Sequence, residues 1–70
     1  MAVLKSTLHE LRREAKMQQA ELAEIVGVRR ETIGNLEAGR YNPSLKLALD
    51  IAHVFHKNVE DVFWFEDDEE

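Results

Sequence analysis

Only the residues VGVR separate two helix-forming segments in the stretch ELAEIVGVRRETIGNLEAG, residues 21–39. Gly27 lies where the first helix has to end, because glycine readily adopts the left-handed conformation that closes a helix and turns the chain. Gly39 marks the end of the second helix in the same way. The sequence therefore predicts two short helices joined by a tight turn, a helix-turn-helix arrangement over residues 18–38.

The second of these helices, residues 29–38, is predicted to have two different faces. At ~100° per residue, Ile33, Leu36 and Glu37 share one face, which suits packing against the other helices. The opposite face is small or able to form hydrogen bonds, as a surface that reads base edges must be. That face and its flanks comprise Arg30, Glu31, Thr32, Gly34, Asn35 and Ala38. Arg29 and Arg30 lie at the N-terminus, the end that usually enters the major groove of DNA, so we expect this to be a recognition helix.

The remaining segments predict three more helices. One precedes the helix-turn-helix, with apolar residues at three- and four-residue steps. Ser44 is placed to cap a very apolar fourth helix, and Asn58 to cap a short fifth one. The aromatic end of the sequence suits a strand better than a helix. We predict an all-α domain of five helices over residues 1–65, in which residues 63–65 form a short strand or extended arm that can pair with residues 2–4.

Composition limits the possible functions. A chain of 70 residues holds one small domain, and it contains no cysteine for disulfides or thiolate metal sites. His53 and His56 are too few ligands for a metal. No nucleophile–histidine–acid set or glycine-rich phosphate loop is present. We therefore expect no metal, no cofactor, no small-molecule ligand and no enzyme activity, in a cytoplasmic protein without a signal peptide or membrane segment.

The net charge of −5 argues at first sight against a nucleic-acid partner. Residues 66–70 carry five of the carboxylates, and without them nine basic residues balance nine acidic ones. Positive charge lies mostly in the first two thirds of the chain. The last five residues are therefore predicted to form an acidic tail that is separate from the domain.

The sequence resembles the Cro and lambda-repressor-like helix-turn-helix regulators of the xenobiotic-response-element type, from about Leu8 to Phe63. The segments that carry the resemblance are QAELAEIVGV, TIGNLEAGRYNPSLKLALDIA and VEDVF. It implies a five-helix lambda-repressor-like fold that binds the major groove of double-stranded DNA. The implied function is sequence-specific transcription regulation without catalysis, most often as a repressor.

The resemblance also implies roles for individual residues. Gln19 matches a glutamine that contacts a phosphate, and Thr32 and Arg40 fall where the DNA backbone is usually contacted. Arg12 and Glu37 match a largely buried ion pair between the first and third helices. The positions that face bases are Arg29, Arg30, Glu31, Gly34 and Asn35.

The residues alone leave some of these roles open. Asn35 either reads adenine through two hydrogen bonds or is a solvated helix residue. Glu31 either accepts from cytosine N4 or holds a neighbouring arginine. Gly34 either allows close approach to DNA or is a tolerated glycine in an exposed helix.

The chain departs from the family pattern at three positions. Gln18 replaces the serine or threonine that usually caps the second helix. Arg29 replaces the serine or threonine that often begins the third helix. Lys16 replaces a glycine after the first helix, so it is expected to need a left-handed conformation.

Lambda-repressor-like proteins dimerise, so that two recognition helices reach successive major grooves. We therefore expect a homodimer and a palindromic operator. The aromatic residues near the C-terminus either complete the core or form the dimer interface. The interface is predicted to comprise Val54, Phe55, Phe63, Trp64 and Phe65. The alternative from another functional class is an antitoxin or adaptor-type module that uses this fold to hold a protein partner.

Overall fold

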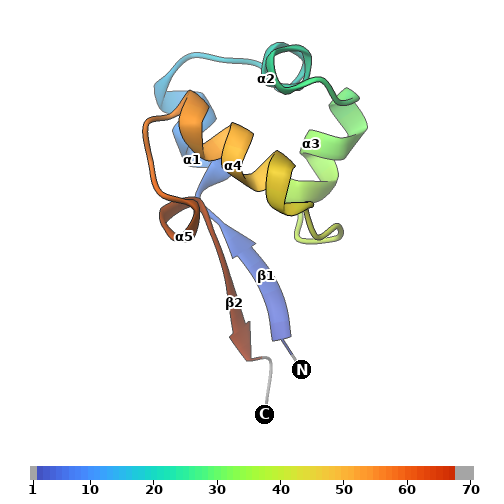
Figure 1. The fold of residues 1–70 in the computed structure, drawn as a ribbon. Coiled ribbons are helices and arrows are strands. Elements are labelled where there is room, and N and C mark those ends of the chain that lie inside the picture. The colour runs from blue at the N-terminus through green and yellow to red at the C-terminus, as the bar shows by residue number, and fades with distance from the viewer. Residues whose placement is uncertain (1, 68–70) are drawn as a thin grey trace.

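A computed structural model describes residues 2–67 as a cluster of helices with a two-stranded arm projecting from it (Figure 1). The predicted all-α domain of five helices with a terminal β-arm is confirmed. The elements in chain order are β1 (Ala2–Ser6), α1 (Leu8–Glu14), α2 (Gln19–Val26), α3 (Arg30–Glu37), α4 (Leu45–Val54), α5 (Val59–Val62) and β2 (Phe63–Asp67).

The arm joins the two ends of the described chain. β1 and β2 are antiparallel, with Leu4 opposite Phe65 and Ser6 opposite Phe63. Each strand is two residues longer than predicted, and β2 extends through Glu66 and Asp67, which were predicted to belong to the acidic tail. The other tail residues, 68–70, lie outside the described residues. The arm begins at the core, since Leu4 is only 5% exposed.

The core lies between the helices and the base of the arm. α4 runs through it and contributes residues along one side, while α2 packs against both α3 and α4, and α3 also contacts β1. The buried residues are all apolar: Leu4, Leu8, Leu22, Ala23, Ile33, Leu36, Leu47, Ala48, Ile51, Ala52, Val62 and Phe63. Burial of this apolar surface provides the main driving force for folding.

Four helices end in a left-handed residue. The residues are Lys16, Gly27, Gly39 and His56, with φ between 55° and 77°. In each case the amide of the next residue donates to a carbonyl five residues back, for example Arg40 N to Asn35 O at 2.9 Å. This is the Schellman motif, which satisfies the last carbonyls of a helix. The left-handed conformation expected of Lys16 is confirmed, while that of His56 was not predicted.

Two helix starts show how capping depends on the sequence. Ser44 Oγ accepts from Leu47 N at 3.1 Å, which confirms its predicted role as the cap of α4. Gln18 precedes α2, and its backbone amide donates to Glu21 Oε1 at 2.7 Å. The carboxylate of Glu21 thus supplies one half of a capping box, the half that binds the backbone amide of the cap residue.

The aromatic residues at the C-terminus divide between the core and the surface. Phe63 is 6% exposed and Phe65 is 57% exposed, while Trp64 is half-buried. Val54 and Phe55 pack, partly buried, against the core. The side chain of Phe63 therefore completes the core, and only a small part of it is exposed for the interface that the sequence predicted.

Candidate nucleic-acid interface

The helix-turn-helix consists of α2, a turn at Gly27 and Val28, and α3. Ile33 and Leu36, which are 0% and 1% exposed, fix the inner face of α3. The predicted DNA-contacting residues lie on the outside or at the ends of α3, apart from Gln19 at the start of α2. Arg29, Arg30, Glu31 and Arg40 are exposed, whereas Gln19, Thr32, Gly34 and Asn35 are partly buried.

An ion pair ties α3 to α1. Arg12 Nε donates to Glu37 Oε2 at 2.7 Å and Arg12 Nη2 donates to Glu37 Oε1 at 3.2 Å. The two side chains are 11% and 8% exposed. Arg12 Nη1 also donates to the carbonyl of Met17 at 2.9 Å, just before α2. The structure thus brings together the two residues that the family resemblance paired, with the two-point geometry that gives arginine–carboxylate contacts their directionality.

Glu37 also holds the glutamine at the start of α2. Gln19 Nε2 donates to Glu37 Oε1 at 3.0 Å, and Gln19 Oε1 accepts from Arg30 Nη1 at 2.9 Å. A carboxylate only accepts and a guanidinium only donates, so these two partners fix the orientation of the Gln19 amide. The result is a continuous chain of hydrogen bonds from the buried ion pair to an exposed arginine on the first turn of α3.

The charge of Glu37 is favoured by its surroundings. Burial raises the pKa of Glu37, but hydrogen bonds from Arg12 and Gln19 and the positive charge of Arg12 outweigh it and leave the pKa below its usual range. His9 lies beside the pair, with Nδ1 3.0 Å from Arg12 Nη2 and 3.4 Å from Glu37 Oε1. Glu37 is therefore ionised at neutral pH and accepts from both Arg12 and Gln19.

The contacts of Gln19 with Glu37 and Arg30 were not predicted. Helical periodicity assigned Glu37 to the inner face, and the resemblance paired it with Arg12. Neither indicates that a residue from another helix reaches the same carboxylate. One signal in the sequence could have indicated a further partner. A buried carboxylate needs several hydrogen-bond donors, and the two donating nitrogens of Arg12 meet this need only in part.

Gly34 lies on the outer part of α3 next to Gln19. A Cβ atom added at Gly34 would lie 3.8 Å from the Gln19 amide atoms, which is ordinary van der Waals contact. Nothing within the domain therefore requires a glycine at this position.

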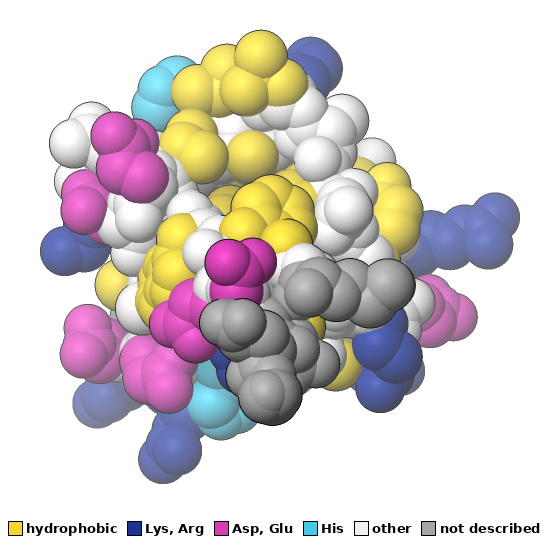
Figure 2. All heavy atoms as spheres, turned by 90° about the horizontal axis from the view of Figure 1, so that it is seen from below, with side chains coloured by type: hydrophobic (Ala, Val, Ile, Leu, Met, Phe, Trp, Pro, Cys, Tyr) yellow, Lys and Arg dark blue, Asp and Glu magenta, His cyan; other side chains and the backbone are white. Residues whose placement is uncertain are grey.

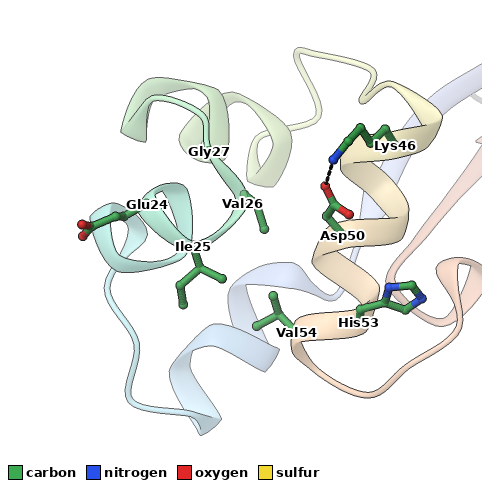
Figure 3. A pocket seen from close by; sticks show the side chains of 8 residues that line it. All are labelled: Glu24, Ile25, Val26, Gly27, Lys46, Asp50, His53 and Val54. Atoms are coloured by element: carbon green, nitrogen blue, oxygen red, sulfur yellow. Dashed lines mark hydrogen bonds and ion pairs between the residues drawn. The ribbon is translucent and has the colours of Figure 1, made fainter.

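A hollow of about 570 Å³ lies between α2 and α4 (Figure 3). Ile25 and Val54 point toward each other across it, and Glu24 points away. On its α4 side, Lys46 Nζ donates to Asp50 Oδ2 at 2.7 Å. No serine, threonine or cysteine lines the hollow, so it holds no nucleophile for a catalytic triad.

Among residues 2–67, no three histidine, cysteine, aspartate or glutamate residues gather closely enough to hold a metal ion. None of the described helices has the length and apolarity needed to cross a bilayer.

The family model for the helix-turn-helix matches residues 8–62, which include α1 to α5. The chain belongs to this helix-turn-helix family. An uncharacterized HTH-type transcriptional regulator of Archaeoglobus fulgidus is 53% identical over 66 residues, which cover 94% of this chain and 93% of that protein.

Two solved structures are also similar to this helix-turn-helix protein. The restriction-modification controller protein C.AhdI of Aeromonas hydrophila has a TM-score of 0.70 and 31% identity, and the match covers 77% of this chain and 82% of that one. The clp gene regulator ClgR of Corynebacterium glutamicum has a TM-score of 0.72 and 29% identity over 79% of this chain, which corresponds to 58% of the regulator.

The family assignment confirms the resemblance to Cro-like regulators of the xenobiotic-response-element type. This is a family of DNA-binding transcriptional regulators and not a family of enzymes.

Proposed function

We propose that this helix-turn-helix protein is a repressor that binds a palindromic operator as a homodimer in the cytoplasm. The observation that carries the proposal is the hydrogen-bond chain from Arg12 through Glu37 and Gln19 to Arg30. It holds an exposed guanidinium at the N-terminus of α3, and a residue that is already oriented loses less conformational entropy on binding.

The proposed contacts fall into two classes. Base edges in the major groove are read by Arg29, Arg30, Glu31, Gly34 and Asn35. Phosphates are contacted by Gln19, Thr32 and Arg40, which flank the base-reading residues. Arg30 is the strongest candidate for guanine, because two of its nitrogens can donate to O6 and N7.

Replacing Arg30 with alanine tests base reading. We expect Arg30→Ala to lose ~1–3 kcal/mol of binding free energy at one base pair and to relax specificity there. The measurement is binding to an operator selected from random duplex DNA and to its single-base variants. Arg13→Ala, at an exposed position on α1, is the charge-matched control. Equal losses on operator and random DNA for Arg30→Ala would rule out base reading.

The proposed dimer interface is an apolar groove between α4 and the arm, with a volume of about 320 Å³. Leu45 is 73% exposed and Phe65 is 57% exposed at this groove. Both side chains are far more exposed than a leucine or phenylalanine that packs against other side chains. Figure 2, which views the molecule along the arm, has apolar side chains gathered at the centre of this face. Three of the predicted interface residues line this groove, namely Phe63, Trp64 and Phe65, and Leu45 joins them. Val54 and Phe55 are not among the groove-lining residues.

Replacing Leu45 with glutamate tests the interface. A charge in a buried apolar contact is costly, so Leu45→Glu is expected to weaken dimerisation at least ~10-fold without unfolding the protomer. Sedimentation at micromolar concentration gives the result. Ile25→Glu, at a residue on α2 that is 59% exposed and does not line the groove, is the matched control. A wild-type monomer bound to a single, non-palindromic half-site would contradict the homodimer.

The net charge of −5 favours one alternative, an antitoxin or adaptor-type module that holds a protein partner. A salt titration with nonspecific duplex DNA separates the two functions. For a DNA-binding protein, log K falls steeply with log salt as counterions are released. A protein-binding module has little affinity for the duplex at any salt concentration.

A further inference from the structure

The two strands of the arm have backbone hydrogen-bonding groups on their outer edges. In an antiparallel pair, residues that exchange hydrogen bonds alternate with residues whose N–H and C=O groups point outward. Thr7 N donates to Val62 O at 3.0 Å, and these two residues continue the register in which Ser6 lies opposite Phe63. By this alternation, the residues whose backbone groups point outward are Ala2, Leu4 and Ser6 on β1 and Phe63, Phe65 and Asp67 on β2.

The outer edge of β1 is covered by the turn that follows α3. A Cβ atom added at Gly39 would lie 2.8 Å from Leu4 O, so this oxygen points away from β2, as the alternation requires. β2 is the strand farther from this turn (Figure 1). Among the described residues, no backbone hydrogen bond from outside the arm reaches Phe65 or Asp67. The arm therefore presents one free edge, which belongs to β2.

The middle residue of this free edge carries a large apolar side chain. Phe65 lies on the same face of the arm as Leu4 and Phe63, which are buried, yet it is 57% exposed. An exposed edge strand is a template for pairing with another chain, and soluble proteins usually block such edges. Phe65 also lines the apolar groove of the proposed dimer interface, so the free edge and the groove form one continuous surface.

We propose that the β2 strands of two copies pair antiparallel, with the two-fold axis at Phe65. The result is a four-stranded sheet in the order β1-β2-β2-β1. Phe65 and the partner's Phe65 then exchange both of their backbone hydrogen bonds, and the two rings lie side by side on the face that carries the groove. The inference rests on the proposed function, in which the protein is a homodimer, and it specifies the contact that joins the two copies.

Strand length and charge select this register. An axis at Trp64 would pair only three residues of each strand, because α5 directly precedes β2. An axis at Glu66 would place two carboxylates directly opposite each other, which destabilises a strand pair. With the axis at Phe65 all five residues of β2 are paired. Asp67 then lies opposite the partner's Phe63, and Glu66 opposite an indole.

This pairing ends at two copies. A two-fold contact uses the same surface on both chains and is therefore closed. The outer strands of the four-stranded sheet are the two copies of β1, whose edge is covered where Leu4 O meets Gly39. The sheet thus has no further free edge at its centre to which a third copy could add.

Single-cysteine variants test the register, because the chain contains no cysteine of its own. On the axis, the Cα atoms of Phe65 and the partner's Phe65 would be ~5.5 Å apart, within the range that a disulfide bridges. The two copies of Trp64 would be diagonal neighbours at ~7–8 Å, too far for a bridge. Under mild oxidation, Phe65→Cys should form an intermolecular disulfide at least ~10-fold faster than Trp64→Cys. Ile25→Cys, at an exposed residue on α2, gives the rate of random collision.

Proline at position 65 tests the backbone contact. The N–H group of Phe65 points away from β1, so Phe65→Pro removes no hydrogen bond of the arm but prevents those across the axis. Phe65→Ala also loses the ring but keeps the N–H group, so it is the matched control. In sedimentation, Phe65→Pro should dimerise at least ~10-fold more weakly than Phe65→Ala, because two hydrogen bonds are lost. Urea denaturation shows whether each protomer is folded, and the cysteine variants decide if the proline variant is not.

The outcomes separate this inference from the proposed function. A wild-type dimer in which Phe65→Cys is oxidised no faster than Ile25→Cys or Trp64→Cys would overturn the inference and leave the homodimer in place. A folded Phe65→Pro variant that dimerises as well as Phe65→Ala would have the same meaning. A wild-type protein that is monomeric both free and on its operator would overturn the inference and the homodimer together.

Discussion

Replacing Glu37 with alanine is expected to lower the free energy of unfolding by about 3–5 kcal/mol, because it leaves the guanidinium of Arg12 buried without its carboxylate. The Arg12 side chain is only 11% exposed, so solvent compensates poorly for the lost partner. Gln19 loses an acceptor at the same time. A chain of this length has a total stability of roughly 4–10 kcal/mol. The substitution should therefore remove a large part of the stability of the protein, which urea denaturation followed by circular dichroism will measure.

Two controls separate this effect from a general loss of charge. Lys46 and Asp50 form an ion pair whose side chains are 84% and 36% exposed, so Lys46→Ala should cost less than about 1 kcal/mol. The double variant Arg12→Met with Glu37→Leu removes both buried charges and should be more stable than either single variant. A cost below about 1 kcal/mol for Glu37→Ala would mean that Arg12 finds other partners.

The pH dependence of stability gives an independent measure of the same contact. The pKa of Glu37 is lowered in the folded protein, so folding favours its charged form. The contribution of Glu37 to stability is fully present above the ordinary glutamate pKa of about 4.3. It is lost as the pH falls below this value and through the lower pKa of the folded state. Glu37→Gln should lack this part of the acid sensitivity.

Local signals were sufficient to predict the helices and the arm. Glycine at a helix end, serine at a helix start and the spacing of Ile33 and Leu36 each act within a few residues along the chain. Such local signals do not indicate which side of a helix or strand faces the core when both of its sides are apolar. α4 is apolar on most of its surface, and only the packing leaves Leu45 outside while Leu47 is buried. Phe63 and Phe65 lie on the same face of β2, yet Phe63 at the base of the arm is buried and Phe65 further along it is exposed.

Contacts between helices lay beyond what periodicity can provide. The Arg12–Glu37 pair was anticipated only because the sequence resembles a family in which the two positions are paired. The link from Glu37 to Gln19 and Arg30 depends on how α2 and α3 meet in space. The choice of partner for an amide is set by the acceptors and donors around it, which a single sequence does not reveal.

The junction between α3 and the arm is a point where the backbone leaves no room for a side chain. Gly39 has φ of 75°, and a Cβ atom added there would lie 2.8 Å from the carbonyl oxygen of Leu4. Leu4 is itself buried and paired with Phe65, so this oxygen cannot move without shifting β1. Gly39 thus meets two constraints at once, a left-handed conformation and a close approach between two backbones.

Gly39→Ala is therefore expected to destabilise the protein by about 2–5 kcal/mol, from left-handed strain of ~1–2 kcal/mol and from displacement of packed backbone at ~1–3 kcal/mol. Urea denaturation of two other glycine variants provides the comparison. Gly27 has φ of 77° but nothing within 4 Å of an added Cβ, so Gly27→Ala should cost only the ~1–2 kcal/mol of strain. Gly34 is helical and has room, so Gly34→Ala should gain up to about 1 kcal/mol. If Gly39→Ala cost no more than Gly27→Ala, the tight contact with Leu4 would be wrong.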